Sequence, residues 1–434
     1  MNKKEIPENT IDIIAQHINE RANRPSNFPI ITIEGETETP HYYEIVQFDE
    51  IDRSERNFFA IDGSYNSQDF YNGLSVGLYT AGYVCYHLGK QVRMNDKDDP
   101  IILGKGYFPE NILYTNDEHK LAVFDELLEL EPVKRLIEDC FQETEIKKIW
   151  GWGENTRETI IRNTSSLLSF CQEVLEWALV WEIANSEIIK EGDVILRDGT
   201  LRSNNIKQEY LIKLGSYLHK KGIHVLAITK NSSIKLELSS TYKKIDNFLQ
   251  TEKKPKYPFK IKNPRWQKLC CWFEVPDDIL LSAYPERSQK IKLSKGEIDE
   301  ITKTSMFARK GLKGGRGFGL FFSARLDYVE KLQNYDWVVV DLNVFDCIPD
   351  VEKGEVKKRN MDLIKTIFKE LTRLTQEHYI LGYPYPLVEA HNFVTLKKSF
   401  KDEVVKRVKA SLYKTQRMDN VDIENLFLDI HDRF

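Results

Sequence analysis

Two short apolar runs in this chain end in the same way, with an aspartate followed by glycine and a small hydroxyl residue. The segments are FFAIDGS at residues 58–64 and VILRDGT at residues 194–200. Apolar runs of this length beside glycine are typical of buried strands. Open α/β sheets bind their ligands at the C-terminal ends of strands, so we predict that Asp62 and Asp198 end two strands and meet there. Because two adjacent carboxylates repel each other unless a cation neutralises them, the pattern indicates a metal site.

The remaining hydrophobic pattern predicts an α/β fold with a mixed sheet and helices on both faces. A strand at 193–198, a helix near 205–221 and a strand at 223–229 form a β-α-β unit, which favours parallel pairing. The other predicted elements are a helix at 10–22, antiparallel strands within 57–106, helices within 117–190, strands at 269–285, 318–327 and 337–342, and helices at 355–377 and 385–414.

Composition allows one large catalytic core. The 434 residues are 41% hydrophobic and 30% charged with a net charge of −5, so a sizeable core is available and basic surface must be local. We predict an N-terminal arm at 1–50 and a core at 51–434, interrupted by an inserted basic segment at about 250–315.

The location predicted from the sequence is the cytoplasm, without membrane spans. Six cysteines lack CxxC spacing and are expected to be buried free thiols. No apolar run approaches the length of a membrane span, and the first residues lack the apolar segment of a signal peptide.

A two-cation centre needs a third acid, and the helix before the second aspartate offers Glu182. Glu182 continues an apolar stripe at steps of three and four residues, where a carboxylate is rare unless it is paired or bound to a metal. Glu173, Glu176 and Glu187 fall off this stripe, and we expect them to be solvated. Asp-Gly turns and helix-surface glutamates are also common structural features, so each residue alone has an ordinary alternative interpretation.

A late segment, GYPYPLVEAH at 382–391, adds a tyrosine and a histidine. Pro386 fits the first turn of a helix that carries His391. Tyr383 and Tyr385 both precede proline, so the pattern leaves open which one faces the site. A phenol and an imidazole held by one rigid turn suit positioning of a phosphate and proton transfer near metal ions.

Together these motifs resemble the NurA family of prokaryotic nucleases. The resemblance rests on both Asp-Gly motifs, the helix glutamate before the second, a strand ending in Lys230 and the Gly-Tyr-Pro…Ala-His segment. It implies an RNase H-like core and manganese-dependent DNA cleavage. The metal ligands that it implies are Asp62, Glu182 and Asp198, completed by Tyr383 and His391, with Lys230 close by.

The resemblance also implies partners and a setting. These are a homodimer, a hexameric HerA-type ATPase partner, and 5′–3′ exonuclease with single-strand endonuclease activity in DNA end resection, repair or phage defence. Carboxylate ligands suit Mg²⁺ or Mn²⁺, and the imidazole favours Mn²⁺. Two such ions about 3.5–4 Å apart can serve both the attacking and the leaving oxygen of a phosphodiester.

DNA binding is predicted from local basic segments. The first contains seven basic residues and three aromatic residues at 253–268, the second lies at 309–316, and the third lies at 397–409. Each segment also fits a solvated surface. The glycine-rich run at 311–319 lacks the Gly-Lys-(Ser/Thr) ending of a P-loop, so ATP hydrolysis is not expected.

Two rival functions remain open on the sequence. An actin- or hexokinase-like phosphotransferase also uses paired Asp-Gly turns, and stabilisation by ATP would favour it. A non-catalytic adaptor that guides DNA into a translocase ring would degrade no DNA. Chelator-sensitive degradation of linear DNA would select the nuclease.

Overall fold

The computed structural model describes most of the predicted core. The described residues are 8–22, 43–46, 55–69, 74–92, 101–109, 126–150, 164–203, 205–230, 232–239, 241–242, 270–275, 318–326, 337–349, 351, 358–376, 382–396, 398–415 and 423–424. The basic segments predicted at 253–268 and 309–316 lie outside these residues.

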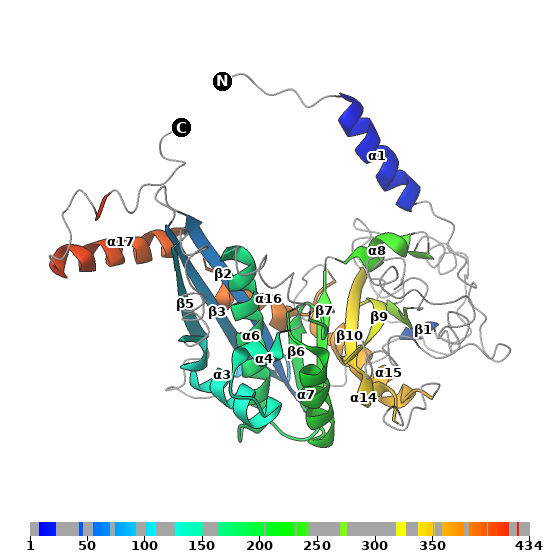
Figure 1. Cartoon of the computed structure of the whole chain (residues 1–434). Coiled ribbons are helices and arrows are strands. Elements are labelled where there is room, and N and C mark those ends of the chain that lie inside the picture. Colours follow the sequence, from blue (N-terminus) through cyan, green and yellow to red (C-terminus); the bar gives the residue numbers. More distant parts are fainter. Residues whose placement is uncertain are drawn as a thin grey trace.

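One ten-stranded sheet organises the molecule (Figure 1). Its order is β1-β8-β9-β10-β7-β6-β2-β3-β4, and β5 also pairs with β3. The neighbours β2, β6 and β7 are parallel, and the other pairs are antiparallel. The strands are β1 (Tyr43–Val46), β2 (Asn57–Asp69), β3 (Leu74–His87), β4 (Lys90–Val92), β5 (Ile101–Pro109), β6 (Val194–Asp198), β7 (His224–Thr229), β8 (Cys270–Glu274), β9 (Gly319–Arg325) and β10 (Trp337–Asn343).

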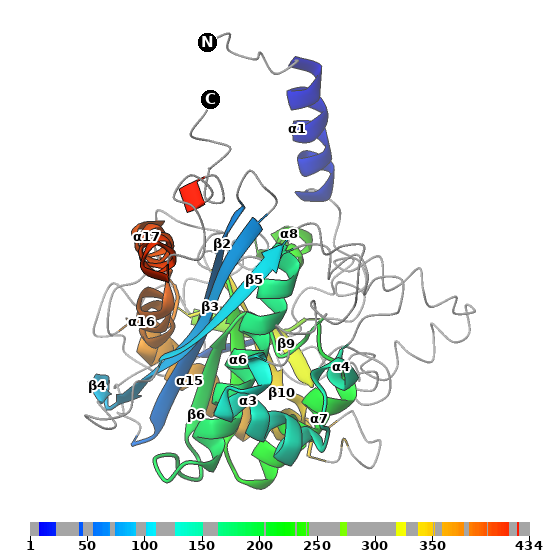
Figure 2. The same ribbon diagram turned by 60° about the vertical axis from the view of Figure 1, so that its left-hand side comes forward.

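Helices lie on both faces of this sheet. Figure 2 shows α16 and α17 on one side of β2 and β3, and α6 on the other. The helices are α1 (Glu8–Ala22), α3 (Glu131–Arg135), α4 (Ile146–Ile149), α6 (Thr164–Asn185), α7 (Gln208–Lys220), α8 (Ser233–Glu237), α14 (Val344–Cys347), α15 (Met361–Gln376), α16 (Tyr385–Val394) and α17 (Lys398–Thr415), with a π-helical turn at Leu136–Phe141.

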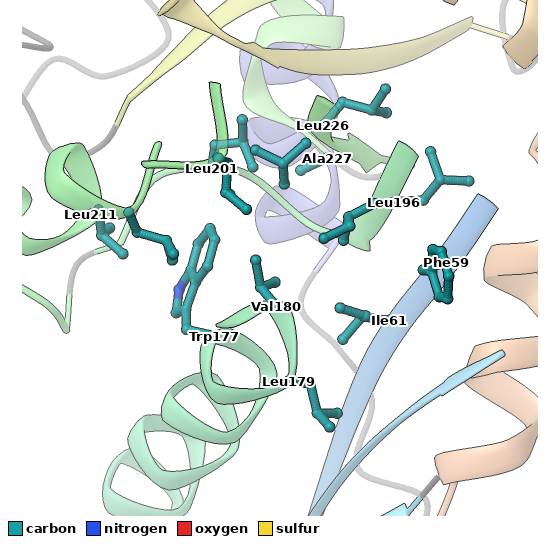
Figure 3. Close-up of a cluster of buried hydrophobic side chains, with 14 of the residues drawn as sticks. Phe59, Ile61, Trp177, Leu179, Val180, Leu196, Leu201, Leu211, Leu226 and Ala227 are labelled. Atoms are coloured by element: carbon teal, nitrogen blue, oxygen red, sulfur yellow. The ribbon is translucent and has the colours of Figure 1, made fainter. Parts of the chain in front are cut away.

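The core lies between α6 and the central strands (Figure 3). Ile61 of β2 faces Leu179 and Val180 of α6, and all three are buried. Burial of each such side chain stabilises the fold by about 1.5–3 kcal/mol. Strand side chains alternate between the two faces, so Asp62, next to Ile61, points toward α16 instead. The same core that holds α6 against the sheet therefore directs the acid to the opposite face.

The mixed α/β sheet with helices on both faces, and the parallel β6-α7-β7 unit, are confirmed. Five of the six cysteines are free and buried, as expected. None of the described helices is long and apolar enough to cross a membrane. β1 and β8 join the sheet, although β1 lies in the predicted arm at 1–50 and β8 in the predicted insertion at 250–315.

One expectation about the first motif is wrong. Asp62 does not end a strand, because β2 continues through Gly63 and Ser64 to Asp69 and pairs with β3 along its whole length. The pairing of β2 with β6 stops at Ile61 and Arg197, one residue before β6 ends at Asp198. The two aspartates still come together, because β6 ends beside the middle of β2.

Candidate active site

Asp62 lies on the part of β2 that extends past its last pairing with β6, and it is 6% exposed. Its Oδ1 accepts a hydrogen bond from the backbone N–H of Gly63 at 2.8 Å. Burial, and then the negative charge of Asp198, raise the pKa of Asp62 above its usual value. A cation placed beside Asp62 would therefore stabilise its ionised form.

Asp198 ends β6, and the backbone turns away directly after it. Gly199 has φ +108°, a conformation that side-chain-bearing residues rarely adopt, so glycine is needed there. The N–H of Gly199 donates to the carbonyl of Ile228 at 3.0 Å, and the hydroxyl of Thr229 donates to the carbonyl of Gly199. These bonds to Ile228 and Thr229, the last two residues of β7, hold the turn. The sheet therefore fixes the position of Asp198.

His391 reaches the aspartates from α16. This helix begins at Tyr385 with Pro386 in its first turn, as the sequence predicts, and packs on β2 and β3. His391 Nδ1 lies 2.8 Å from Asp62 Oδ2, and 57% of its side chain is exposed. The imidazole therefore joins a buried carboxylate to the protein surface.

Among the described residues, Asp62, Asp198 and His391 form a group able to hold a metal ion. Each offers one ligand atom, and these atoms all lie within 4.8 Å of one another. Cis ligands of an octahedral ion at about 2.1 Å lie about 3 Å apart. The 2.8 Å between the histidine and aspartate atoms is therefore compatible with shared coordination. Two carboxylates with one imidazole suit Mn²⁺ or Mg²⁺.

Tyr383 and Lys230 lie beside this group. The buried hydroxyl of Tyr383 donates to the carbonyl of Ile228 at 3.0 Å. Burial and the negative charge of Asp198 raise the pKa of Tyr383 well above its usual value. The exposed Lys230 places its Nζ 3.8 Å from the centroid of the Tyr383 ring. Tyr385 instead packs edge-on against Tyr86, so Tyr383 is the tyrosine that contacts the site.

Glu182 does not join the group. Its Oε1 lies 2.8 Å from Nε of Arg135, and 26% of its side chain is exposed. The stripe that pointed to Glu182 is not selective, because α6 is buried on nearly all sides. Its buried residues include Leu167, Leu168, Phe170, Cys171, Val174, Leu175, Trp177, Ala178, Leu179, Val180 and Ile183.

Glu176 is the acid of α6 that lies near the aspartates, and the expectation that it is solvated is wrong. It is 2% exposed and lies against Gly63, where an added Cβ would stand 2.5 Å from Glu176 Oε1. Burial raises the pKa of Glu176 to about 7, while Arg197 opposes the rise and Asp62 adds to it. A sequence signal existed in Gly63, which allows a helix carboxylate to approach β2 closely.

Comparison with known proteins agrees with the motifs. The NurA domain model matches residues 56–396. No curated protein matches. Among solved structures, the NurA nuclease from Sulfolobus solfataricus is 13% identical, with a TM-score of 0.39 over 95% of this chain and 96% of its own. A NurA structure bound to dAMP and manganese is 10% identical, with a TM-score of 0.31 over 98% and 99%. Because the NurA domain model matches most of this chain, the chain belongs to the NurA family.

Proposed function

We propose that this protein is a metal-dependent nuclease that hydrolyses DNA phosphodiester bonds at the group formed by Asp62, Asp198 and His391. The convergence of these three side chains from β2, β6 and α16 carries the proposal. The repulsion between the two neighbouring carboxylates is unfavourable unless a cation neutralises it. Membership in the NurA family supports the same reaction.

The proposed cofactor is Mn²⁺, with Mg²⁺ as the alternative. Carboxylate oxygens bind either ion, and the imidazole of His391 favours manganese. A divalent ion held by these residues would polarise the scissile phosphate and lower the pKa of a bound water. The sequence-based expectation of two ions needs a further carboxylate, and Glu176 is the acid of α6 that lies against β2 near Asp62.

The protein side chains around the ion have distinct proposed roles. Asp62 and Asp198 hold the ion, and His391 either binds it or orients Asp62 through Nδ1. Tyr383 fixes the end of β7 through Ile228 and limits the freedom of Asp198. The ammonium group of Lys230 provides an exposed positive charge beside the site, suited to a phosphate oxygen.

The biological setting follows from family membership and forms part of the proposal. We expect an RNase H-like catalytic core, a homodimer, a hexameric HerA-type ATPase as partner and a cytoplasmic location. The expected activity is 5′–3′ exonuclease with single-strand endonuclease activity in end resection, repair or phage defence. Cleavage of DNA labelled at one end, with and without such an ATPase, tests the polarity and the partnership together.

The central test is cleavage of linear DNA by the purified full chain in Mn²⁺, with and without EDTA. We expect chelator-sensitive degradation, lost in Asp62→Asn and Asp198→Asn. Asp402→Asn on the exposed face of α17 is the matched control, because it removes one exposed carboxylate from an element that supplies none of the three site residues. No degradation, accompanied by thermal stabilisation with ATP, would support a phosphotransferase instead.

A further inference from the structure

Arg197 places a buried positive charge directly beside the acidic group. It precedes Asp198 in β6 and is 7% exposed. Neighbouring strand residues point to opposite faces, so Asp198 faces α16 while Arg197 faces α6. The protein therefore already has a cation on the side of the sheet opposite Asp62, Asp198 and His391.

The contacts of Arg197 tie two parts of the site together. Its Nη2 lies 2.5 Å from Glu176 Oε2, and its Nη1 donates to the carbonyl of Thr200 in the turn after Asp198. Its guanidinium lies over the Trp177 ring, with Cζ 4.7 Å from the ring centroid. A planar, always charged group that is stacked and paired in this way is fixed in position.

Both oxygens of Glu176 already have a donor in this arrangement. Gln172 Nε2 donates to its Oε1 at 2.7 Å, and Arg197 holds its Oε2. A metal ion at Glu176 would have to share an oxygen with one of these donors or displace it. Displacing Arg197 would leave a guanidinium buried without a counter-charge, which is strongly unfavourable. Glu176 is also not a member of the metal-binding group found among the described residues.

We propose that the site binds a single tightly held divalent ion on Asp62, Asp198 and His391, and that Arg197 supplies beside Glu176 the positive charge that a second ion would otherwise provide. The inference rests on the proposed metal-dependent function and replaces its two-ion form. Arg197 is then a positioning residue: it neutralises Glu176 and holds the turn after Asp198, without touching the substrate.

The number of Mn²⁺ ions bound by the full-length protein tests this inference directly. Titration calorimetry, with electron paramagnetic resonance to count free Mn²⁺, is expected to show one tight ion in the wild type. Two ions of comparable affinity would overturn the role of Arg197 while leaving the nuclease proposal intact. No bound ion, or unchanged binding in Asp198→Asn, would instead reject the metal site itself.

Three variants sharpen the test without relying on activity. Arg197→Gln is expected to gain a second bound ion, because Glu176 loses its counter-charge. The matched Arg197→Lys keeps the charge and is expected to bind one ion.

Glu176→Gln is expected to change the affinity for the first ion by less than about threefold. A loss of about 100-fold would identify Glu176 as a ligand and overturn the inference. If Arg197→Gln does not fold, the wild-type count and Glu176→Gln still decide; if it folds and binds one ion, the inference fails.

Discussion

Two clusters of aspartate and histidine lie at opposite ends of the parallel pair β6 and β7. At one end Asp198 closes β6 next to Ile228, and at the other His224 begins β7 next to Val194. The first cluster joins Asp62 and Asp198 to one imidazole. The second joins one carboxylate, Asp346 of α14, to two imidazoles. The same residue types thus appear with opposite charge balance.

The second cluster is satisfied by its own members. Asp346 Oδ1 lies 2.6 Å from His219 Nδ1, and its Oδ2 lies 3.1 Å from His224 Nδ1. Although burial opposes ionisation, the two hydrogen bonds lower the pKa of Asp346. In the first cluster, burial and Asp198 raise the pKa of Asp62. A cluster in which carboxylates outnumber imidazoles is suited to bind a cation, whereas a carboxylate paired with two imidazoles stabilises the fold.

The largest expected difference between the clusters is in catalysis. Asp198→Asn removes a proposed metal ligand, and we expect DNA cleavage in Mn²⁺ to fall by about 10³-fold, equivalent to about 4 kcal/mol of activation free energy. Asp346→Asn, measured where it is folded, is expected to stay within about threefold of the wild type. Release of acid-soluble nucleotides from linear DNA measures both. Similar losses in the two variants would contradict the division into a catalytic and a structural cluster.

Stability is expected to show the reverse order, with a smaller effect. Asp346→Asn replaces a charged, buried acceptor of two part-buried hydrogen bonds, so we expect a loss of about 2–3 kcal/mol in the free energy of unfolding. Asp198→Asn in EDTA relieves the repulsion with Asp62 and is expected to be neutral or stabilising. Urea denaturation measures both, with Asp402→Asn as a surface control expected within about 0.5 kcal/mol. A destabilised Asp198→Asn without metal would show that its charge is already compensated.

Local sequence signals were sufficient for most of the strands and for the three members of the proposed metal-binding cluster. Glycine after Asp198 and the periodicity of 205–221 identify the β6-α7-β7 unit, and Pro386 marks the start of the helix that carries His391. The same signals misplace the end of the first strand. Asp-Gly-Ser is typical of turns, but pairing of Asp62 with Gly82 and of Ser64 with Thr80 keeps β2 extended. That pairing is a tertiary contact that local propensity does not contain.

The missed residues share a different cause. Periodicity selects one face of a helix, but α6 has sheet and helix neighbours around most of its surface, so periodicity cannot separate Glu176 from Glu182. The decision comes from partners elsewhere in the chain, Arg197 for Glu176 and Arg135 for Glu182. Asp346 is likewise defined by His219, which lies 127 residues away.

The smallest expected effect, and the one that separates the clusters without an assay of activity, is the pH dependence of stability in EDTA. A carboxyl with a raised folded pKa favours the folded state at low pH and loses this contribution as the pH rises through that pKa. Asp62 belongs to this class. A carboxyl with a lowered folded pKa contributes stability above its unfolded pKa and loses it as the pH falls through the folded value. Asp346 belongs to that class.

Comparison of each asparagine variant with the wild type by urea denaturation, from pH 3 to 8, therefore should give slopes of opposite sign. The stability of Asp62→Asn relative to the wild type should rise with pH, because the variant lacks the carboxylate that burial and Asp198 disfavour. The deficit of Asp346→Asn should be largest above the unfolded pKa of aspartate and shrink in acid. Saturating Mn²⁺ should reverse the first slope, because an ion on Asp62 and Asp198 favours their ionised forms, and should leave the second unchanged. Parallel slopes in EDTA would mean that the two clusters differ in position only, and that the charge balance around Asp62 does not create the affinity for a cation.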